Sequence, residues 1–227
     1  MKTDLTPKHW LYRLLREPVN SLTHLFGVFL SITGLVILLV LSAGEPWRTT
    51  SFAIYGASLI TLYTASTLLH SLKVKARIER GLRIFDHAAI FGLIAGTYTP
   101  IALVTLQREH AVWGWVILGV VWGLALFGVV FKVVWLSAPR WLSTGIYLLM
   151  GWLAVVAIVP LIQALPLGGF MWLLLGGAFY SVGAVIYGLK KPDFFPRVFG
   201  YHELWHLFVL AGSTCHFVMM LHYVLPA

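Results

Sequence analysis

Charged residues and cysteine are both scarce in this chain. Only 11% of the 227 residues are charged, whereas 59% are hydrophobic and 10 are Trp. This composition excludes an ordinary soluble domain and indicates a membrane protein with several spans. The single cysteine, Cys215, excludes an intramolecular disulfide and is best interpreted as a small buried hydrophobic residue.

Other expected signals are missing too. Residues 1–16 are polar and basic, and the apolar run that follows is too long for the core of a secretory signal peptide. No internal repeat is evident, which argues against a transporter built from two related halves. The net charge of +8 is spread over loops, without a basic domain or an aromatic–basic motif, so we expect no nucleic-acid partner.

Seven apolar segments are each long enough to cross a bilayer. The sequence therefore predicts an all-α integral membrane protein, with spans near residues 20–42, 51–71, 85–106, 111–132, 140–162, 168–189 and 203–225. We expect one seven-helix membrane domain, residues 20–227, preceded by a cytoplasmic N-terminal segment, residues 1–19. Small residues within several spans predict closely packed helices.

Lys and Arg are distributed unevenly between the two sides of this arrangement. Of the 16 Lys and Arg residues, only Arg48 and Arg108 fall on one side. Because Lys and Arg concentrate in cytoplasmic loops, the bias predicts a cytoplasmic N-terminus and a C-terminus on the outside.

Five ionisable residues from four spans fall at one depth near the predicted cytoplasmic face: His24, His70, Asp86, His202 and His206. Such groups are costly within a membrane unless they are paired, hydrated or bound to a metal, so the cluster is a hypothesis of function. His202 and His206 are four residues apart and share one helix face. With His70 they form the best trio for Zn²⁺, which favours imidazole ligands and often uses three protein ligands in catalytic sites.

Two further residues could act beside this trio. Ser66 precedes His70 by one helical turn and faces the same way. Asp86 could orient a ligand or accept a proton from a water molecule at the metal. Each residue alone also has a structural explanation, such as a helix N-cap for Asp86, and the shared depth favours the metal site. Ligand type does not exclude other ions that bind imidazole.

The segment from His202 to His206 also fits the H-E-x-x-H pattern, in which Glu203 would be the general base of an intramembrane metalloprotease. Alternatively, Glu203 is an acidic residue favoured in the first turn of a helix. We prefer the second interpretation, because the third ligand comes most naturally from upstream.

Together these residues resemble the haemolysin III branch of the progestin and adipoQ receptor (PAQR) family, from about Glu17 to the end of the chain. The motifs are Glu17-x-x-Asn20-x-x-x-His24, Ser66-x-x-x-His70, Phe85-Asp86-His87, Gly96-Thr97-Tyr98-Thr99-Pro100, and His202-x-x-x-His206 followed by Cys215-His216-Phe217.

The resemblance implies seven membrane helices with zinc near the cytoplasmic face. His70, His202 and His206 would be its ligands, with Ser66 and Asp86 close to the zinc and its water. Glu17, Asn20 and His24 would be supporting residues that close the cytoplasmic mouth of the bundle or hydrogen-bond the site.

The resemblance also implies a bacterial inner-membrane protein concerned with membrane-lipid homeostasis, because relatives are associated with that role or with ceramidase-like activity. Our first hypothesis is a zinc-dependent hydrolase of lipid amide or ester bonds, with membrane lipids as its partners. The main alternative is a non-catalytic sensor or stress protein with structural zinc. A pore-forming haemolysin and the metalloprotease are lesser alternatives. The substrate and the oligomeric state stay open.

Overall fold

The computed structural model describes residues 10–195 and 198–226. The first nine residues of the predicted N-terminal segment, residues 1–19, lie outside the described residues. The described residues form helices and no strand: α1 (Leu11–Leu14), α2 (Pro18–Leu41), α3 (Pro46–Ser71), α4 (Ala76–Pro100), α5 (Ala111–Val134), α6 (Arg140–Gly151), α7 (Ile158–Ala164), α8 (Leu167–Leu189) and α9 (Tyr201–Met219). Three irregular helical segments continue them: Ile101–Thr105 after α4, Trp152–Ala157 between α6 and α7, and Met220–Val224 after α9.

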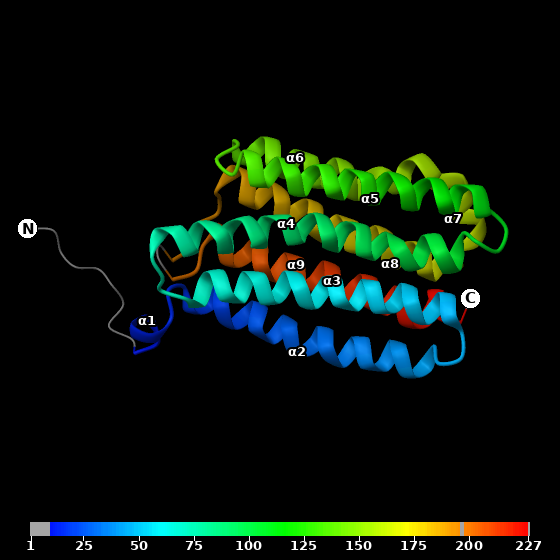
Figure 1. Ribbon diagram of the computed structural model, residues 1–227, viewed down its shortest axis with the longest axis horizontal. Helices are drawn as coiled ribbons and strands as arrows, with labels where there is room; N and C mark the ends of the chain where they lie inside the picture. The colour runs from blue at the N-terminus through cyan, green and yellow to red at the C-terminus, as the bar shows by residue number, and fades with distance from the viewer. Residues whose placement is uncertain (1–9, 196–197, 227) are drawn as a thin grey trace, which may run out of the picture.

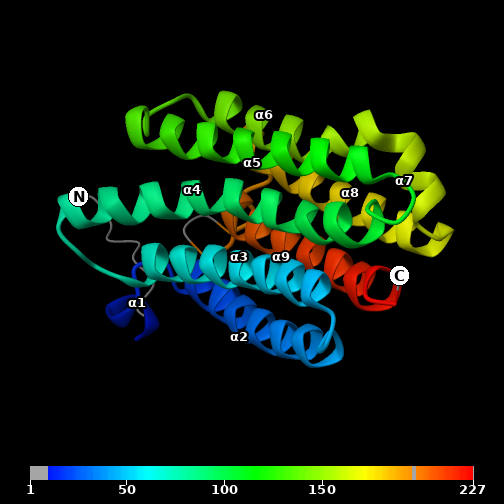
Figure 2. The same cartoon turned by 45° about the vertical axis from the view of Figure 1, so that its right-hand side comes forward.

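Seven helical spans in the described part of the chain are long and apolar enough to cross a membrane. Figures 1 and 2 show them lying side by side, with α2 and α3 on one flank, α5 to α7 on the other, and α4, α8 and α9 between. The predicted all-α, seven-helix class is confirmed. The sixth span is one helix, whereas the fifth consists of α6, a 3₁₀ segment and α7.

The third span begins earlier than the sequence predicted. The predicted span begins near residue 85, but α4 already begins at Ala76. Within these first turns Arg83 Nη2 lies 2.6 Å from Glu79 Oε1, one turn away. Such i,i+4 pairs support a helix in water, so α4 projects beyond its apolar part.

The core has buried residues from α2, α3, α4, α5, α6, α7 and α9, among them the large side chains of Phe52, Tyr55 and Phe91. Close approach of helices depends on small residues at several positions, of which Gly96 and Gly128 are examples. A side chain on Gly96 would collide with Ser58 of α3, and one on Gly128 of α5 would collide with the ring of Phe91. These contacts agree with the close packing expected from the sequence.

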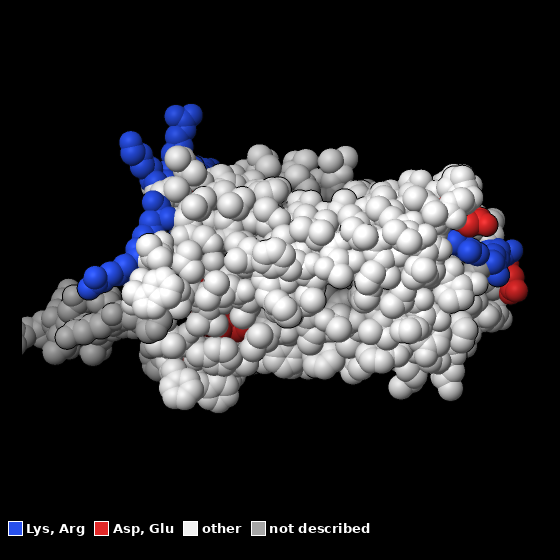
Figure 3. Space-filling model, turned by 90° about the horizontal axis from the view of Figure 1, so that it is seen from below, with Lys and Arg blue, Asp and Glu red and all other residues white. Residues whose placement is uncertain are grey.

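Charged side chains lie at the two ends of the bundle, and a broad uncharged belt separates them on the face drawn in Figure 3. We call the end at which α2, α4, α6 and α9 begin the basic end. His70, Asp86 and His202 all lie at this end, since α3 ends there and α4 and α9 begin there.

Candidate metal centre

Three histidines converge at the basic end. His70 is in the last turn of α3, and His202 and His206 are in the first two turns of α9. One ring nitrogen from each lies within 4.8 Å of the other two. The ring centroid of His70 is 5.0 Å from that of His202 and 4.9 Å from that of His206. The three residues could therefore hold a metal ion, and imidazole donors suit zinc among other transition metals.

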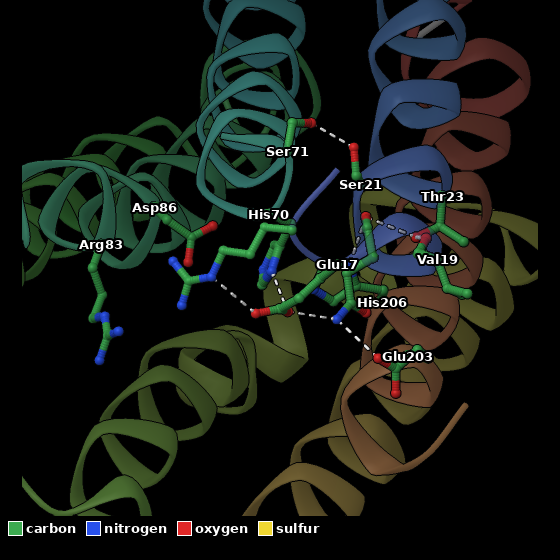
Figure 4. A network of polar contacts seen from close by, with 12 residues as sticks. Glu17, Val19, Ser21, Thr23, His70, Ser71, Arg83, Asp86, Glu203 and His206 are labelled. Carbon is green, nitrogen blue, oxygen red and sulfur yellow. Dashed lines mark hydrogen bonds and ion pairs between the residues drawn. The ribbon is translucent and has the colours of Figure 1, made fainter. Parts of the chain in front are cut away.

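Two of these rings are held by acceptors at the start of α2, as Figure 4 shows for Glu17. His70 Nδ1 donates to Glu17 Oε2 at 2.7 Å, and His206 Nδ1 donates to the backbone oxygen of Asn20 at 3.3 Å. We assign these tautomers from the acceptors, since neither oxygen can donate. Nε2 of both rings is then left to bind a metal, and such partners typically orient metal-binding histidines.

Backbone hydrogen bonds fix the start of α2 beside the end of α3. The amide of Glu17 donates to the carbonyl of His70 at 2.9 Å, and the amide of Arg16 donates to the carbonyl of Ser71 at 3.2 Å. Pro18 then begins the helix, where its fixed φ is favourable. The ligand and its acceptor are thus positioned by the same junction.

Asn20 connects α9 to the start of α2. Its Nδ2 donates to Glu17 Oε2 at 3.0 Å and to Glu203 Oε1 at 2.9 Å. Only 1% of Asn20 is exposed, and these bonds satisfy both N–H donors of its buried amide, whereas Oδ1 has no hydrogen-bond partner among the described residues. Asn20 therefore links α2 to α9 at the level of the histidines.

Glu17 carries a negative charge at neutral pH. Burial raises its pKa, but the hydrogen bonds from His70 and Asn20 and the electrostatic effect of the neighbouring histidines lower the pKa to about 2. An ionised acceptor makes the stronger hydrogen bond to an imidazole N–H.

Glu203 is engaged in the cap of α9. Its Oε1 accepts from Asn20, and its Oε2 accepts from the backbone amide of Gly200 at 2.8 Å. Both oxygens therefore serve the helix start, which agrees with the first-turn interpretation. This arrangement argues against the metalloprotease alternative, in which Glu203 must face the metal.

Asp86 and Ser66 line the same cavity as the three histidines. Asp86 lies well inside α4, so the interpretation as an N-cap is wrong: charged residues extend the helix by more than two turns before it. Its side chain is 14% exposed, and Oδ2 is 3.2 Å from Nδ1 of His87. Ser66 is buried one turn before His70. The catalytic roles of both stay predictions.

His24 joins the cluster by ring stacking. Its centroid is 3.7 Å from that of His206, with an angle of 14° between the planes. The ring is buried, and among the described residues neither nitrogen has a hydrogen-bond partner. All the site residues expected from the sequence therefore lie around one end of the bundle, where His24 stacks on His206 and lines the same cavity.

Sequence reasoning missed the basic residues of this cavity. Arg16, Arg83, Lys132 and Arg140 served only to predict orientation, yet all four line the cavity. The available signal was spacing: Lys132 continues the pattern of Val121, Ala125 and Gly128 at intervals of three and four residues, which marks one helix face.

Comparisons with known proteins identify the family of the chain. The model of the family described as "Haemolysin-III related" matches residues 12–217. The chain is 44% identical over 215 residues to the Hemolysin-3 homolog of Bacillus subtilis, covering 94% of this chain and 96% of that protein. It is 43% identical over 212 residues to the Hemolysin-3 of Bacillus cereus, covering 92% of each. A more distant relative is the human Monocyte to macrophage differentiation factor, which is 26% identical over 212 residues, covering 90% of this chain and 83% of that protein. The chain therefore belongs to the haemolysin-III related family of multi-pass membrane proteins.

Proposed function

We propose that this chain is a zinc-dependent hydrolase of amide or ester bonds in lipids of the bacterial inner membrane, where it serves membrane-lipid homeostasis. The observation that carries the proposal is the position of the three histidines, which converge on the wall of a large and mainly apolar cavity. Its volume of about 650 Å³ is within the usual range of ligand pockets, roughly 300–1,000 Å³.

The cavity is long enough for a lipid chain. It is lined by His202 near its basic end and by His216 deeper in α9. These residues are separated by about 21 Å along the helix, at about 1.5 Å per residue. One leaflet of the hydrocarbon core is roughly 15 Å deep, half of about 30 Å. A lipid whose amide or ester lies at the histidines could therefore extend its chain inside the bundle.

Trp152 and Val155, in the segment between α6 and α7, line the cavity and are 42% and 53% exposed. In this proposal the substrate enters the cavity from the membrane past these two residues.

The residues fit a hydrolytic role in the following way. A bound zinc ion would polarise a substrate carbonyl and make a water molecule more acidic. In this proposal Asp86 accepts a proton as water attacks the carbonyl carbon, and returns it to the leaving nitrogen or oxygen as that bond breaks. Ser66 donates a hydrogen bond to the carbonyl oxygen. Glu17 and Asn20 hold His70 and His206 in position.

The test combines metal analysis with lipid profiling of the purified, full-length protein. We expect about one zinc ion per chain in the wild type, loss of that ion in His206→Ala, and its retention in His222→Ala, whose exposed histidine lies at the other end of the bundle. Incubation with a total bacterial lipid extract should release free fatty acid only with variants that hold zinc. Full turnover by a zinc-free His206→Ala protein would refute the proposal.

A second variant separates catalysis from a structural metal. Asp86→Asn should keep zinc and lose turnover by about 100-fold or more, as expected for loss of a general base. A different result would support the non-catalytic sensor in place of the hydrolase. In that case the protein holds zinc but cleaves no lipid, and the histidine variants change only its thermal stability.

A further inference from the structure

Lys132 occupies a core position of α5. The buried stripe of this helix runs through Gly114, Ile117, Val121, Ala125, Gly128 and Lys132. Gly128 faces the ring of Phe91 in α4, so the stripe points into the bundle. Only 1% of Lys132 is exposed, although an apolar residue would complete the stripe without the cost of burying an ammonium group.

The contacts of Lys132 leave its charge uncompensated. Its Nζ donates to Ser143 Oγ of α6 and lies 5.4 Å from the ring centroid of Phe131. Among the residues that the structure describes, it forms no ion pair. An ammonium group has three donors, and one neutral hydroxyl satisfies only one of them. The other two donors of Lys132 are on a side chain that lines the cavity.

The surroundings of Lys132 favour an anion. Ser143 lies in the first turn of α6, and the N-terminus of a helix carries free amides and a partial positive charge. Arg140, at the start of α6, also lines the cavity and donates to the Tyr201 hydroxyl at 3.1 Å. The cavity has four basic lining residues, Arg16, Arg83, Lys132 and Arg140, and its acidic lining residues are Glu17 and Asp86.

This cationic region is connected to the candidate metal centre through aromatic rings. The guanidinium carbon of Arg140 lies 5.2 Å from the ring centroid of Tyr187. The ring of Tyr187 in turn lies 5.5 Å from that of His202. An anion bound beside α6 would therefore share the cavity with a group at the histidines.

We propose that Lys132, Ser143 and the first turn of α6 bind the anionic headgroup of a membrane lipid, whose chain lies in the apolar part of the same cavity. Phosphate or carboxylate oxygens would accept from Nζ, from the Ser143 hydroxyl and from the amides of Arg140 and Trp141, because those of Leu142 and Ser143 already donate to Pro139. The assignment of the bound lipid as a substrate rests on the proposed hydrolase, whereas the binding site itself does not depend on it. The substrate class is then an anionic lipid.

The test measures lipid binding without turnover. Native mass spectrometry of the full-length protein in detergent is run with dioleoyl-phosphatidylglycerol, dioleoyl-phosphatidylcholine and inorganic phosphate. We expect phosphatidylglycerol to bind about tenfold more tightly than phosphatidylcholine, as one bond to a charged group would give. Lys132→Met should abolish this preference and Lys132→Arg should retain it. Lys191→Met, which removes the same charge from an exposed residue at the same end, should leave it unchanged.

Two further variants keep the result interpretable. Ser143→Ala should reduce the preference about fivefold, and it serves if Lys132→Met does not fold. His206→Ala should retain the preference, so failure of the hydrolase and failure of this site are separate outcomes. Equal binding of both lipids, or an unchanged preference in Lys132→Met, would overturn the proposal. Inorganic phosphate that binds as tightly as phosphatidylglycerol would overturn the assignment to a lipid.

Discussion

At the scale of single residues, the candidate metal centre depends on how its imidazoles are held. His70 is fixed by a carboxylate and His206 by a backbone carbonyl, and both acceptors come from the first residues of α2. The ligands themselves come from α3 and α9. Three helices therefore have to meet before two rings point in the required direction, so the centre forms only in the folded bundle.

Glu17→Gln tests this arrangement. The amide oxygen can still accept from His70, but it is neutral, and the Glu17 carboxylate is ionised at neutral pH. We expect the affinity for zinc to fall about 10- to 100-fold, the usual effect of changing a residue that orients a metal ligand. Competition with a zinc chelator of known affinity measures the change.

Glu45→Gln is the matched control, because Glu45 is an exposed residue at the opposite end of the bundle. Equal zinc affinity in the wild type and Glu17→Gln would show that Glu17 does not orient a ligand. A loss of the same size in Glu45→Gln would point to a general effect of net charge.

The sequence predicted much of this centre, for reasons of spacing and depth. His202 and His206 share a face because they are one turn apart, and His70 ends a span at the same depth. The hydrogen-bond partners of the ligands were harder to predict. Glu17 precedes His70 by many residues, and the contact between them depends on how α2 docks on α3. Lys132 was missed because a basic residue near a span end normally indicates orientation.

At the scale of helices, packing depends on glycines whose faces meet a neighbour. Gly128 is buried against Phe91, whereas Gly123, on the same helix, has open space where its side chain would be. Both are small residues within a span, and composition alone predicts the same role for each. Their difference follows from the direction that each faces on α5, which the sequence pattern specifies only once the buried stripe is known.

Gly128→Val should therefore destabilise the bundle, while Gly123→Val should be tolerated. Overpacking a tight contact costs about 1–3 kcal/mol. Thermal unfolding of the purified proteins in detergent, followed by Trp fluorescence, should show a transition several degrees lower for Gly128→Val. Equal transitions for the two variants would mean that α5 does not pack on α4 through Gly128.

Helix bounds were predicted well where composition changes sharply and poorly where it does not. The second and sixth spans end at Ser71 and Leu189, as expected. The basic segment before the third span was predicted to lie outside the helix, because charge is unfavourable in lipid. The helix nevertheless extends through it, because water beyond the bilayer solvates the charges and Glu79 pairs with Arg83.

At the scale of the whole molecule, the charge distribution and the cavity differ in how far the sequence predicts them. The uneven distribution of Lys and Arg was evident in the sequence, and it accounts for the basic end of the bundle in Figure 3. The cavity was not predictable, because its lining residues come from α3, α4, α6, α8 and α9, which are far apart in the sequence. No local pattern encodes that space.

The orientation of the bundle decides which leaflet the candidate metal centre faces, and the single cysteine makes it measurable. Cys215 is 5% exposed, so a background carrying Cys215→Ser removes a poorly reactive thiol. Into it we place Lys75→Cys at the basic end or His222→Cys at the opposite end, both at exposed positions. In right-side-out membrane vesicles, a maleimide that cannot cross the membrane should label His222→Cys and spare Lys75→Cys, because basic loops stay in the cytoplasm. Inside-out vesicles should give the reverse pattern. Labelling of Lys75→Cys in right-side-out vesicles would instead make the histidines face the outer leaflet, and the lipids available to the cavity would then be those of the outer leaflet.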